Sequence, residues 1–319
     1  MERTRIFVTR KIPEAGLTRL QESFDVEVSP FDRNLTPAEI IEMAAGAQGM
    51  VSIATDTIDK ELIDRLTDIK IIANYAVGFD NIDIEYARQK GIPVTNTPDV
   101  LTQATADIAM ALILCVARRI VEGDKLVRKG GFKGFYPMFF LGVELENKIL
   151  GIYGMGRIGQ AVAKKALNFG LKIIYHDKIT HDEGSLGFPA RYVSFEELLR
   201  ESDFISIHAP LTEETHHRFT KEEFGKMKNG AYCINTARGP LVKEEDLVGA
   251  LKEGWIAGAG LDVYEFEPKV HPDLITLDNV VLLPHIGSAA IEVREKMSLL
   301  VADNLIPFFE GASPPNKVN

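Results

Sequence analysis

The chain reads Gly151-Ile152-Tyr153-Gly154-Met155-Gly156-Arg157-Ile158-Gly159, and a helical run from Gln160 to Asn168 follows. A strand that enters a Gly-x-Gly-x-x-Gly turn and then a helix is typical of a dinucleotide-binding βαβ unit. Gly154 permits a tight turn, Gly156 lets the backbone approach a pyrophosphate, and Gly159 lets the helix pack closely on the strand. The N–H groups at the start of the helix and the positive end of its dipole face the phosphates. We therefore expect the whole turn to bind a dinucleotide, from Gly154 through Met155, Gly156, Arg157 and Ile158 to Gly159.

Asp177 lies 18 residues after Gly159, at the end of the next β-rich run. A carboxylate at this place accepts hydrogen bonds from the adenosine ribose and repels a 2′-phosphate. A solvated aspartate at a strand end is the plain alternative, but strand, glycines, helix, second strand and acid occur here in order within one unit. The pattern favours NAD(H) over NADP(H), and the neighbouring cation Lys178 leaves NADP(H) open.

Short β-rich runs alternate with helical runs along the whole chain, which is typical of parallel sheets covered by helices. In the first half we expect strands at residues 5–9, 26–29, 49–53, 69–74 and 93–96, helices at 13–22, 37–45, 60–66 and 83–90, and one long helix at 102–129. Thr36 is expected to cap the second helix, with Pro37 in its first turn. In the second half we expect strands at 149–153, 171–175, 204–207, 231–235, 256–261 and 280–283, and a last helix at 289–309. The predicted fold class is α/β with two doubly wound parallel-sheet domains.

Composition limits the classes of partner. The 319 residues are 45% hydrophobic, enough for the cores of about two domains. A formal net charge of −10 argues against nucleic acid and anionic membranes, because both are bound mainly through clustered Lys and Arg. A small anionic substrate would need a local basic site instead.

Cys115 and Cys233 lie in apolar runs and are expected to be buried, reduced thiols, and no metal site is predicted. The N-terminus lacks the apolar core of a signal peptide, and the longest apolar run, Ile108 to Ala117, is about half the length of a membrane-spanning helix. These features predict a soluble, cytoplasmic protein.

Three loops after predicted strands carry the groups that hydride transfer to a carbonyl requires, namely a cation, a proton donor and an orienting acid. They read Asn235-Thr236-Ala237-Arg238-Gly239-Pro240, Asp262-Val263-Tyr264-Glu265-Phe266-Glu267-Pro268 and Pro284-His285-Ile286-Gly287-Ser288. Taken singly, each of these residues would be better explained as a charged loop residue or a surface histidine. Open α/β sheets bind ligands at the carboxyl ends of their strands, so the three loops together predict a site.

Further motifs are Tyr75-Ala76-Val77-Gly78-Phe79-Asp80-Asn81-Ile82-Asp83, Thr105-Ala106-Asp107 and His208-Ala209-Pro210-Leu211-Thr212. With the glycine-rich turn and the three loops, they resemble the D-isomer-specific 2-hydroxyacid dehydrogenase family over almost the whole chain. The resemblance implies that Arg238 binds the substrate carboxylate and carbonyl, that Glu267 orients His285, and that His285 transfers the proton. These roles are physically coherent, because a guanidinium can grip a carboxylate as a fork and a carboxylate beside an imidazole stabilises the imidazolium form.

The resemblance also implies further contacts. Substrate contacts would come from Val77 and Gly78, whose backbone N–H groups hold the carboxylate, and from Ser288. Cofactor contacts would come from Thr105, Asp177, His208, Ala209, Pro210, Thr236, Ala237, Arg238, Asp262, His285 and Gly287, in addition to the glycine-rich turn.

The same resemblance implies a discontinuous, flavodoxin-like substrate domain of residues 1–97 and 287–319 around a Rossmann NAD-binding domain of residues 98–286. The long helices at 102–129 and 289–309 would connect the two, and a cleft between the lobes would exclude water when it closes. The family also implies a homodimer. The apolar run Phe135-Tyr136-Pro137-Met138-Phe139-Phe140 is expected at the dimer interface, and a buried loop within the monomer is the alternative.

Met138 to Gly142 and His285 to Ala289, with Arg294 shortly after, most resemble the glyoxylate and hydroxypyruvate reductase branch. Ser288 and Arg294 are candidates to contact a hydroxylated substrate. A helix cap for Ser288 and a solvated side chain for Arg294 explain the two residues equally well. Three alternatives remain for the substrate, namely acids of the 2-ketogluconate, D-lactate and D-glycerate 3-phosphate type. A different class also stays open, since NAD-sensing corepressors resemble these dehydrogenases.

Overall fold

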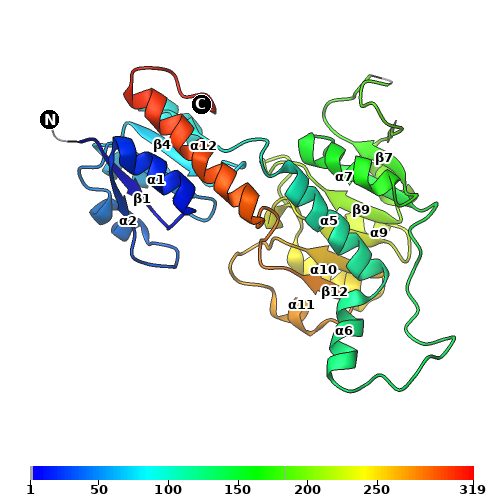
Figure 1. The fold of residues 1–319 in the computed structure, drawn as a ribbon. Coiled ribbons are helices and arrows are strands. Elements are labelled where there is room, and N and C mark those ends of the chain that lie inside the picture. The colour runs from blue at the N-terminus through cyan, green and yellow to red at the C-terminus, as the bar shows by residue number, and fades with distance from the viewer. Residues whose placement is uncertain (1–2, 183) are drawn as a thin grey trace. The chain divides into compact units, whose positions relative to one another are not determined.

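The computed structural model describes residues 3–182 and 184–319. The chain divides into two compact units, each with its own parallel sheet. Unit 1 comprises the described residues up to Leu101 together with Ser288–Asn319, and unit 2 comprises Thr102–Gly287. Figure 1 colours unit 1 blue, cyan and red, and unit 2 green to orange. The predicted α/β class with two parallel sheets is confirmed.

In unit 1 the sheet order is β2-β1-β3-β4-β5, the order typical of flavodoxin-like sheets. Its strands are β1 (Arg5–Val8), β2 (Asp25–Val28), β3 (Gly49–Ile53), β4 (Ile71–Tyr75) and β5 (Val94–Thr95), all paired in parallel. Its helices are α1 (Glu14–Ser23), α2 (Pro37–Met43), α3 (Lys60–Arg65), α4 (Ile84–Gln89) and α12 (Ile291–Phe309). Thr36 caps α2 through a reciprocal contact with Glu39, and Pro37 lies in the first turn, as predicted.

Helices from the two ends of the chain pack together in unit 1. Gly16 in α1 lies so close to α12 that a Cβ atom there would be 2.3 Å from the Ser298 carbonyl oxygen. The Gly16 N–H donates to Ser298 Oγ at 3.1 Å. Figure 1 shows α1 and α12 side by side over one face of the sheet. The chain's last long helix therefore completes the layer that its first helix begins.

Unit 2 contains a seven-stranded parallel sheet within its described residues, in the order β12-β11-β10-β9-β6-β7-β8. The strands are β6 (Ile149–Tyr153), β7 (Lys172–His176), β8 (Arg191–Tyr192), β9 (Phe204–Ile207), β10 (Tyr232–Asn235), β11 (Gly258–Leu261) and β12 (Val280–Leu282). Counted from β6, this is the doubly wound order of dinucleotide-binding folds with one strand added at an edge.

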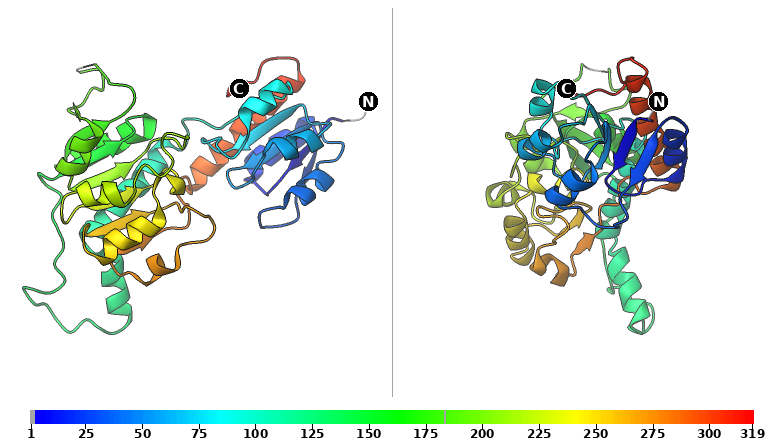
Figure 2. Two further views of the ribbon diagram at one scale, coloured as in Figure 1. Left: turned by 180° about the vertical axis from the view of Figure 1, so that it is seen from behind. Right: turned by 90° about the vertical axis from the view of Figure 1, so that its left-hand side faces the viewer.

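Two buried apolar clusters lie on the two faces of this sheet. One face is covered by α5 (Thr102–Ala117) and α7 (Arg157–Leu167). The other face is covered by α8 (Phe195–Glu201), α9 (Lys221–Lys226) and α10 (Glu244–Lys252). Figure 2 shows the sheet and its helices from two further directions. The remaining helices are α6 (Ile120–Arg128) and α11 (Pro272–Thr276), and Gly239–Leu241 forms a short 3-10 turn, η1. A sheet buried on both faces explains why its strands are almost uniformly apolar.

Two local expectations about the long helices are wrong. Residues 102–129 form two helices, because the backbone at Arg119 enters the left-handed region with φ of 54°. Neither long helix links the units, since α5 belongs to unit 2 and α12 to unit 1. The chain passes between the two compact units after Leu101 and after Gly287, within a few residues of the predicted domain boundaries at 97 and 286. Those boundaries stay a prediction.

The surface differs from expectation at Cys115, and at residues 135–140 it excludes the alternative of a buried loop. Cys115 is half-buried, and only Cys233 is fully enclosed. The apolar run at 135–140 does not form a buried loop, because Phe135 is 88% exposed and Met138 is 82% exposed. Among the described helices, none is long and apolar enough to cross a membrane.

Candidate active site

The glycine-rich turn joins β6 to α7. Gly154 has a φ of 97°, and a Cβ atom there would meet the Ala209 backbone nitrogen at 2.5 Å, so only glycine fits. Gly156 precedes the first turn of α7 and provides no side-chain cap, and a Cβ atom there would meet nothing within 4 Å. The turn thus leaves open space beside the N–H groups at the start of a helix, which is the cradle that a pyrophosphate requires.

Asp177 follows β7 and braces the same turn. Its Oδ2 accepts the Met155 N–H at 2.6 Å, and its Oδ1 accepts the Ile179 N–H at 3.1 Å. These two contacts fix the carboxylate beside the turn, where a ribose acid is expected. Lys178, the next residue, forms an ion pair with Glu214.

His208, Ala209 and Pro210 follow β9, the strand beside β6. The His208 N–H donates to the Tyr153 carbonyl at 2.7 Å, and its Nε2 lies 2.7 Å from Ser206 Oγ. Burial lowers the pKa of His208 to about 3, so the imidazole is neutral near pH 7. This segment therefore places the backbone of Ala209 and the uncharged imidazole of His208 beside the glycine-rich turn.

Arg238 follows β10 in a turn that Asn235 stabilises. The Asn235 side chain donates to the Arg238 carbonyl at 2.8 Å and accepts the Ala237 N–H at 3.0 Å. Arg238 Nη1 donates to the Ala237 carbonyl at 2.8 Å. Sequence reasoning missed Asn235, although an amide at the end of a strand before a Gly/Pro turn is a recognisable signal.

Glu267 and His285 are in direct contact. His285 Nδ1 lies 2.8 Å from Glu267 Oε2, while Glu267 Oε1 accepts the Tyr264 N–H at 3.0 Å. Burial raises the pKa of Glu267, but the bonds from His285 and Tyr264 and the positive charge of Arg238 outweigh it, so the net pKa lies below its usual value. Glu267 is therefore an ionised acceptor for His285.

Asp262 holds the turn that carries His285. Its two carboxylate oxygens accept the N–H groups of Ile286 and Gly287, each at 2.7 Å, and the side chain is almost completely buried. Thr105 Oγ1 donates to the Gly287 carbonyl at 3.2 Å. These hydrogen bonds hold the turn that carries His285, and the cofactor contacts of Asp262, Thr105 and Gly287 stay a prediction.

Three neighbouring parallel strands supply this site. β10 pairs with β11 and β11 with β12, and their carboxyl ends lead to Arg238, to Asp262 and Glu267, and to His285. Parallel strands end at one edge of the sheet, so residues that are far apart in sequence meet there.

Residues 110–287, more than half of the chain, match the NAD-binding domain of the D-isomer specific 2-hydroxyacid dehydrogenases. The chain belongs to this family. It is 52% identical to the glyoxylate reductase of Thermococcus litoralis, covering 99% of this chain and 96% of that protein. It is 48% identical to the glyoxylate reductase of Korarchaeum cryptofilum with the same coverage.

Solved structures superpose on this chain over almost its full length. The TT0316 protein of Thermus thermophilus superposes with a TM-score of 0.93 at 46% identity, covering 99% of this chain and 100% of that one. The NADPH-dependent glyoxylate/hydroxypyruvate reductase of Sinorhizobium meliloti, solved with NADP and malonate, has a TM-score of 0.90 at 33% identity, with 99% and 97% covered. The predicted family and its glyoxylate reductase branch are thus confirmed, and the chain is an oxidoreductase that acts on CH–OH groups with NAD or NADP.

In this dehydrogenase the expected substrate contacts Val77, Gly78 and Ser288 belong to unit 1, while the three expected catalytic residues belong to unit 2. Asn74 and Asn96 donate to the carbonyls of Gly78 and Val77 at 2.9 and 2.8 Å and so fix that loop. The Ser288 carbonyl accepts Arg294 Nε at 3.2 Å, so this arginine braces the start of α12.

The residues present fit a nicotinamide dinucleotide. Besides the open cradle at Gly156, Thr236 Oγ1 is buried and has no hydrogen-bond partner within residues 3–182 and 184–319. A buried hydroxyl without a partner is costly, and a bound amide at this strand edge would satisfy it. Thr236 was expected to lie near the nicotinamide.

Proposed function

We propose that this dehydrogenase reduces glyoxylate, and hydroxypyruvate with it, using NADH. The observation that carries the proposal is the contact of His285 with Glu267 beside the charge of Arg238, at the ends of three adjacent strands. The identity to relatives named glyoxylate reductase supports the choice of substrate.

In the proposed reaction, the Arg238 guanidinium binds the substrate carboxylate and polarises the neighbouring carbonyl. The bound nicotinamide supplies the hydride. Glu267 occupies His285 Nδ1, which leaves Nε2 as the nitrogen that donates a proton to the developing alkoxide. One carbonyl thus gains a hydride and a proton and becomes a secondary or primary alcohol, while His285 is left neutral.

We assign the preference for NADH to Asp177, which the backbone N–H groups of Met155 and Ile179 hold in place. A second carboxylate, Glu214, forms an ion pair with Lys178, the cation that follows Asp177 in the chain. Both features favour an unphosphorylated ribose.

We further propose that unit 1 is the substrate domain, with Val77, Gly78 and Ser288 as its contacts, and that unit 2 is the cofactor domain. The protein acts as a homodimer in this proposal, with the exposed run 135–140 at the interface. Its apolar side chains, among them Phe135 and Met138, are the support for that surface. The proposed location is the cytoplasm.

The test is NADH oxidation, then NADPH oxidation, with glyoxylate, hydroxypyruvate, pyruvate and longer 2-oxo acids. We expect glyoxylate and hydroxypyruvate to give the highest kcat/KM with NADH. Activity confined to a longer or phosphorylated acid would contradict the substrate but leave the chemistry in place, and a clear preference for NADPH would contradict the role of Asp177.

A further inference from the structure

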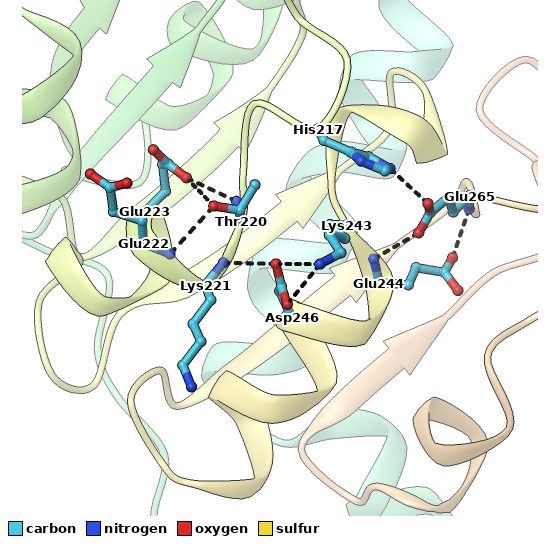
Figure 3. A network of polar contacts seen from close by, with 9 residues as sticks. All are labelled: His217, Thr220, Lys221, Glu222, Glu223, Lys243, Glu244, Asp246 and Glu265. Atoms are coloured by element: carbon cyan, nitrogen blue, oxygen red, sulfur yellow. Dashed lines mark hydrogen bonds and ion pairs between the residues drawn. The ribbon is translucent and has the colours of Figure 1, made fainter.

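Glu265 lies two residues before Glu267, and its side chain is 10% exposed. Its Oε1 lies 2.7 Å from His217 Nε2, and its Oε2 accepts the Glu244 N–H at 2.9 Å. Figure 3 shows His217 and Glu244 reaching Glu265 from two different segments. One carboxylate therefore joins the loop before α9 and the start of α10 to the loop that carries Glu267.

The Glu244 side chain in turn accepts hydrogen bonds from the loop that carries Glu265. Its Oε1 accepts the Glu265 N–H at 2.7 Å, and its Oε2 accepts the His271 N–H at 3.2 Å. Glu244 is 3% exposed. Burial raises its pKa, the two N–H bonds lower it, and the negative charge of Glu265 raises it further. The two negative charges repel one another, and each carboxylate is held by the backbone N–H of the other residue.

The segment that carries His217 also contacts the turn that carries Arg238. The His217 N–H donates to the Pro240 carbonyl at 2.7 Å, and the Phe219 N–H donates to the Leu241 carbonyl at 3.0 Å. The turns that carry Arg238 and Glu267 are packed tightly, because a Cβ atom on Gly239 would lie 1.8 Å from the Tyr264 carbonyl oxygen. A shift of either turn would therefore displace the other.

We propose that Glu265 is a positioning residue that holds the Glu267 loop in register with the Arg238 turn, through His217 and Glu244. It acts through Glu267, whose distance to His285 sets the orientation of the imidazole. The inference rests on the proposed roles of Arg238, Glu267 and His285. It adds to them a carboxylate that lies outside the set that contacts substrate.

The first test compares Glu265→Ala with Glu265→Gln. Alanine removes both acceptors, and we expect kcat to fall on the order of 10- to 100-fold, since a displacement of about 1 Å in a catalytic group has that effect. The dissociation constant for NADH should change much less than kcat, because the glycine-rich turn is not part of this network. Glutamine keeps an acceptor for the Glu244 N–H and offers an amide to His217, so it should recover most of the rate.

The matched control is Glu245→Ala. Glu245 is exposed and adjacent to Glu244 in α10, so its loss changes the charge of the same helix turn and leaves the network intact. Wild-type kinetics are expected. A drop equal to that of Glu265→Ala would overturn the inference, because the effect would then come from charge alone.

The deciding measurement is a double-mutant cycle with Glu267→Gln. If Glu265 acts through Glu267, Glu265→Ala should lower kcat in the wild-type background and have little effect when Glu267 is already replaced. Multiplicative losses would overturn the inference and leave the role of Glu267 intact. A fully active Glu267→Gln variant would instead contradict the proposed catalytic set, and the positioning role with it.

His217→Asn provides a second route if Glu265→Ala does not fold. The backbone at His217 has a φ of 49°, a conformation that asparagine adopts more readily than most residues. The variant removes the imidazole contact without new backbone strain. It should lower kcat in the same direction and lose that effect in the Glu267→Gln background, whereas an unchanged kcat would overturn the inference.

Discussion

At the scale of single residues, the backbone at His285 is as informative as its ring. Its φ of 53° is in the left-handed region, and the two N–H groups that follow are held by Asp262. The imidazole is thus projected from a turn that is held in place by hydrogen bonds. Replacement of the ring alone requires a residue that tolerates this conformation.

We predict that His285→Asn abolishes most of the turnover and weakens NADH binding far less than it lowers kcat. Asparagine accepts the left-handed backbone but cannot donate a proton as an imidazolium does, so the loss should be about 10²- to 10⁴-fold in kcat. Steady-state kinetics and NADH fluorescence titration check both parts. Retention of wild-type kcat would contradict the role of His285 as proton donor.

We predict that Asp177→Ala raises the ratio of kcat/KM for NADPH to that for NADH. Removal of the carboxylate ends its repulsion of a 2′-phosphate, while the loss of its bond to the Met155 N–H weakens both cofactors. The ratio therefore isolates specificity from affinity. An unchanged ratio would place the ribose acid elsewhere.

At the scale of elements, the close contact between α1 and α12 requires a residue without a Cβ atom at position 16. Gly16→Ala would place a Cβ atom 2.3 Å from the Ser298 backbone oxygen, so the two helices must move apart. We predict a loss of about 1–3 kcal/mol in the free energy of unfolding, as for other overpacked sites. Urea denaturation measures it.

Gly249→Ala is the control for that variant. A Cβ atom on Gly249 in α10 meets nothing within 4 Å, and alanine favours helix over glycine. This variant should be unchanged or more stable by up to about 1 kcal/mol. Equal losses at both positions would show that helix contact is not the cause at Gly16.

Strands and helices were predictable where a local pattern of apolar residues marks them in the sequence. The strands at 49–53, 149–153 and 204–207 have the predicted bounds, because each is an apolar run buried on both faces. The two-residue strand β8 was missed because Arg191 and Tyr192 are exposed and form no apolar run. The break between α5 and α6 was missed because Ala117-Arg118-Arg119 holds neither glycine nor proline.

The site was predictable only in part, for a different reason. Arg238, Glu267 and His285 follow strands in recognisable motifs, and their catalytic roles stay predictions. Glu265 and its partners could not be found this way, because His217 lies 48 residues from Glu265 and Glu244 lies 21 residues away. Contacts of that separation are created by the order of strands in the sheet, which local sequence does not encode.

At the scale of the whole molecule, ionisation of Glu267 links the site to stability. Its pKa lies below the usual 4.5, so its ionised form contributes stability above pH 4.5, and this contribution is lost as the pH falls through the lower folded-state pKa. We predict that the gap in melting temperature between wild type and Glu267→Gln is larger at about pH 7 than at about pH 4. Thermal unfolding across this range measures it, and a gap that widens on acidification would contradict the assignment.

Because unit 1 is formed by two segments that flank unit 2 in the sequence, the two units cannot fold in the order in which they begin to be translated. Residues 102–287 form a continuous unit that can fold once they have left the ribosome. Unit 1 cannot fold first, because α12, which packs against α1 and β4, is translated only after the whole of unit 2. Until α12 has been made, the part of unit 1 that precedes residue 102 exposes the apolar surface that α12 later covers, so this is the part of the protein that we expect to be most exposed to misfolding during synthesis.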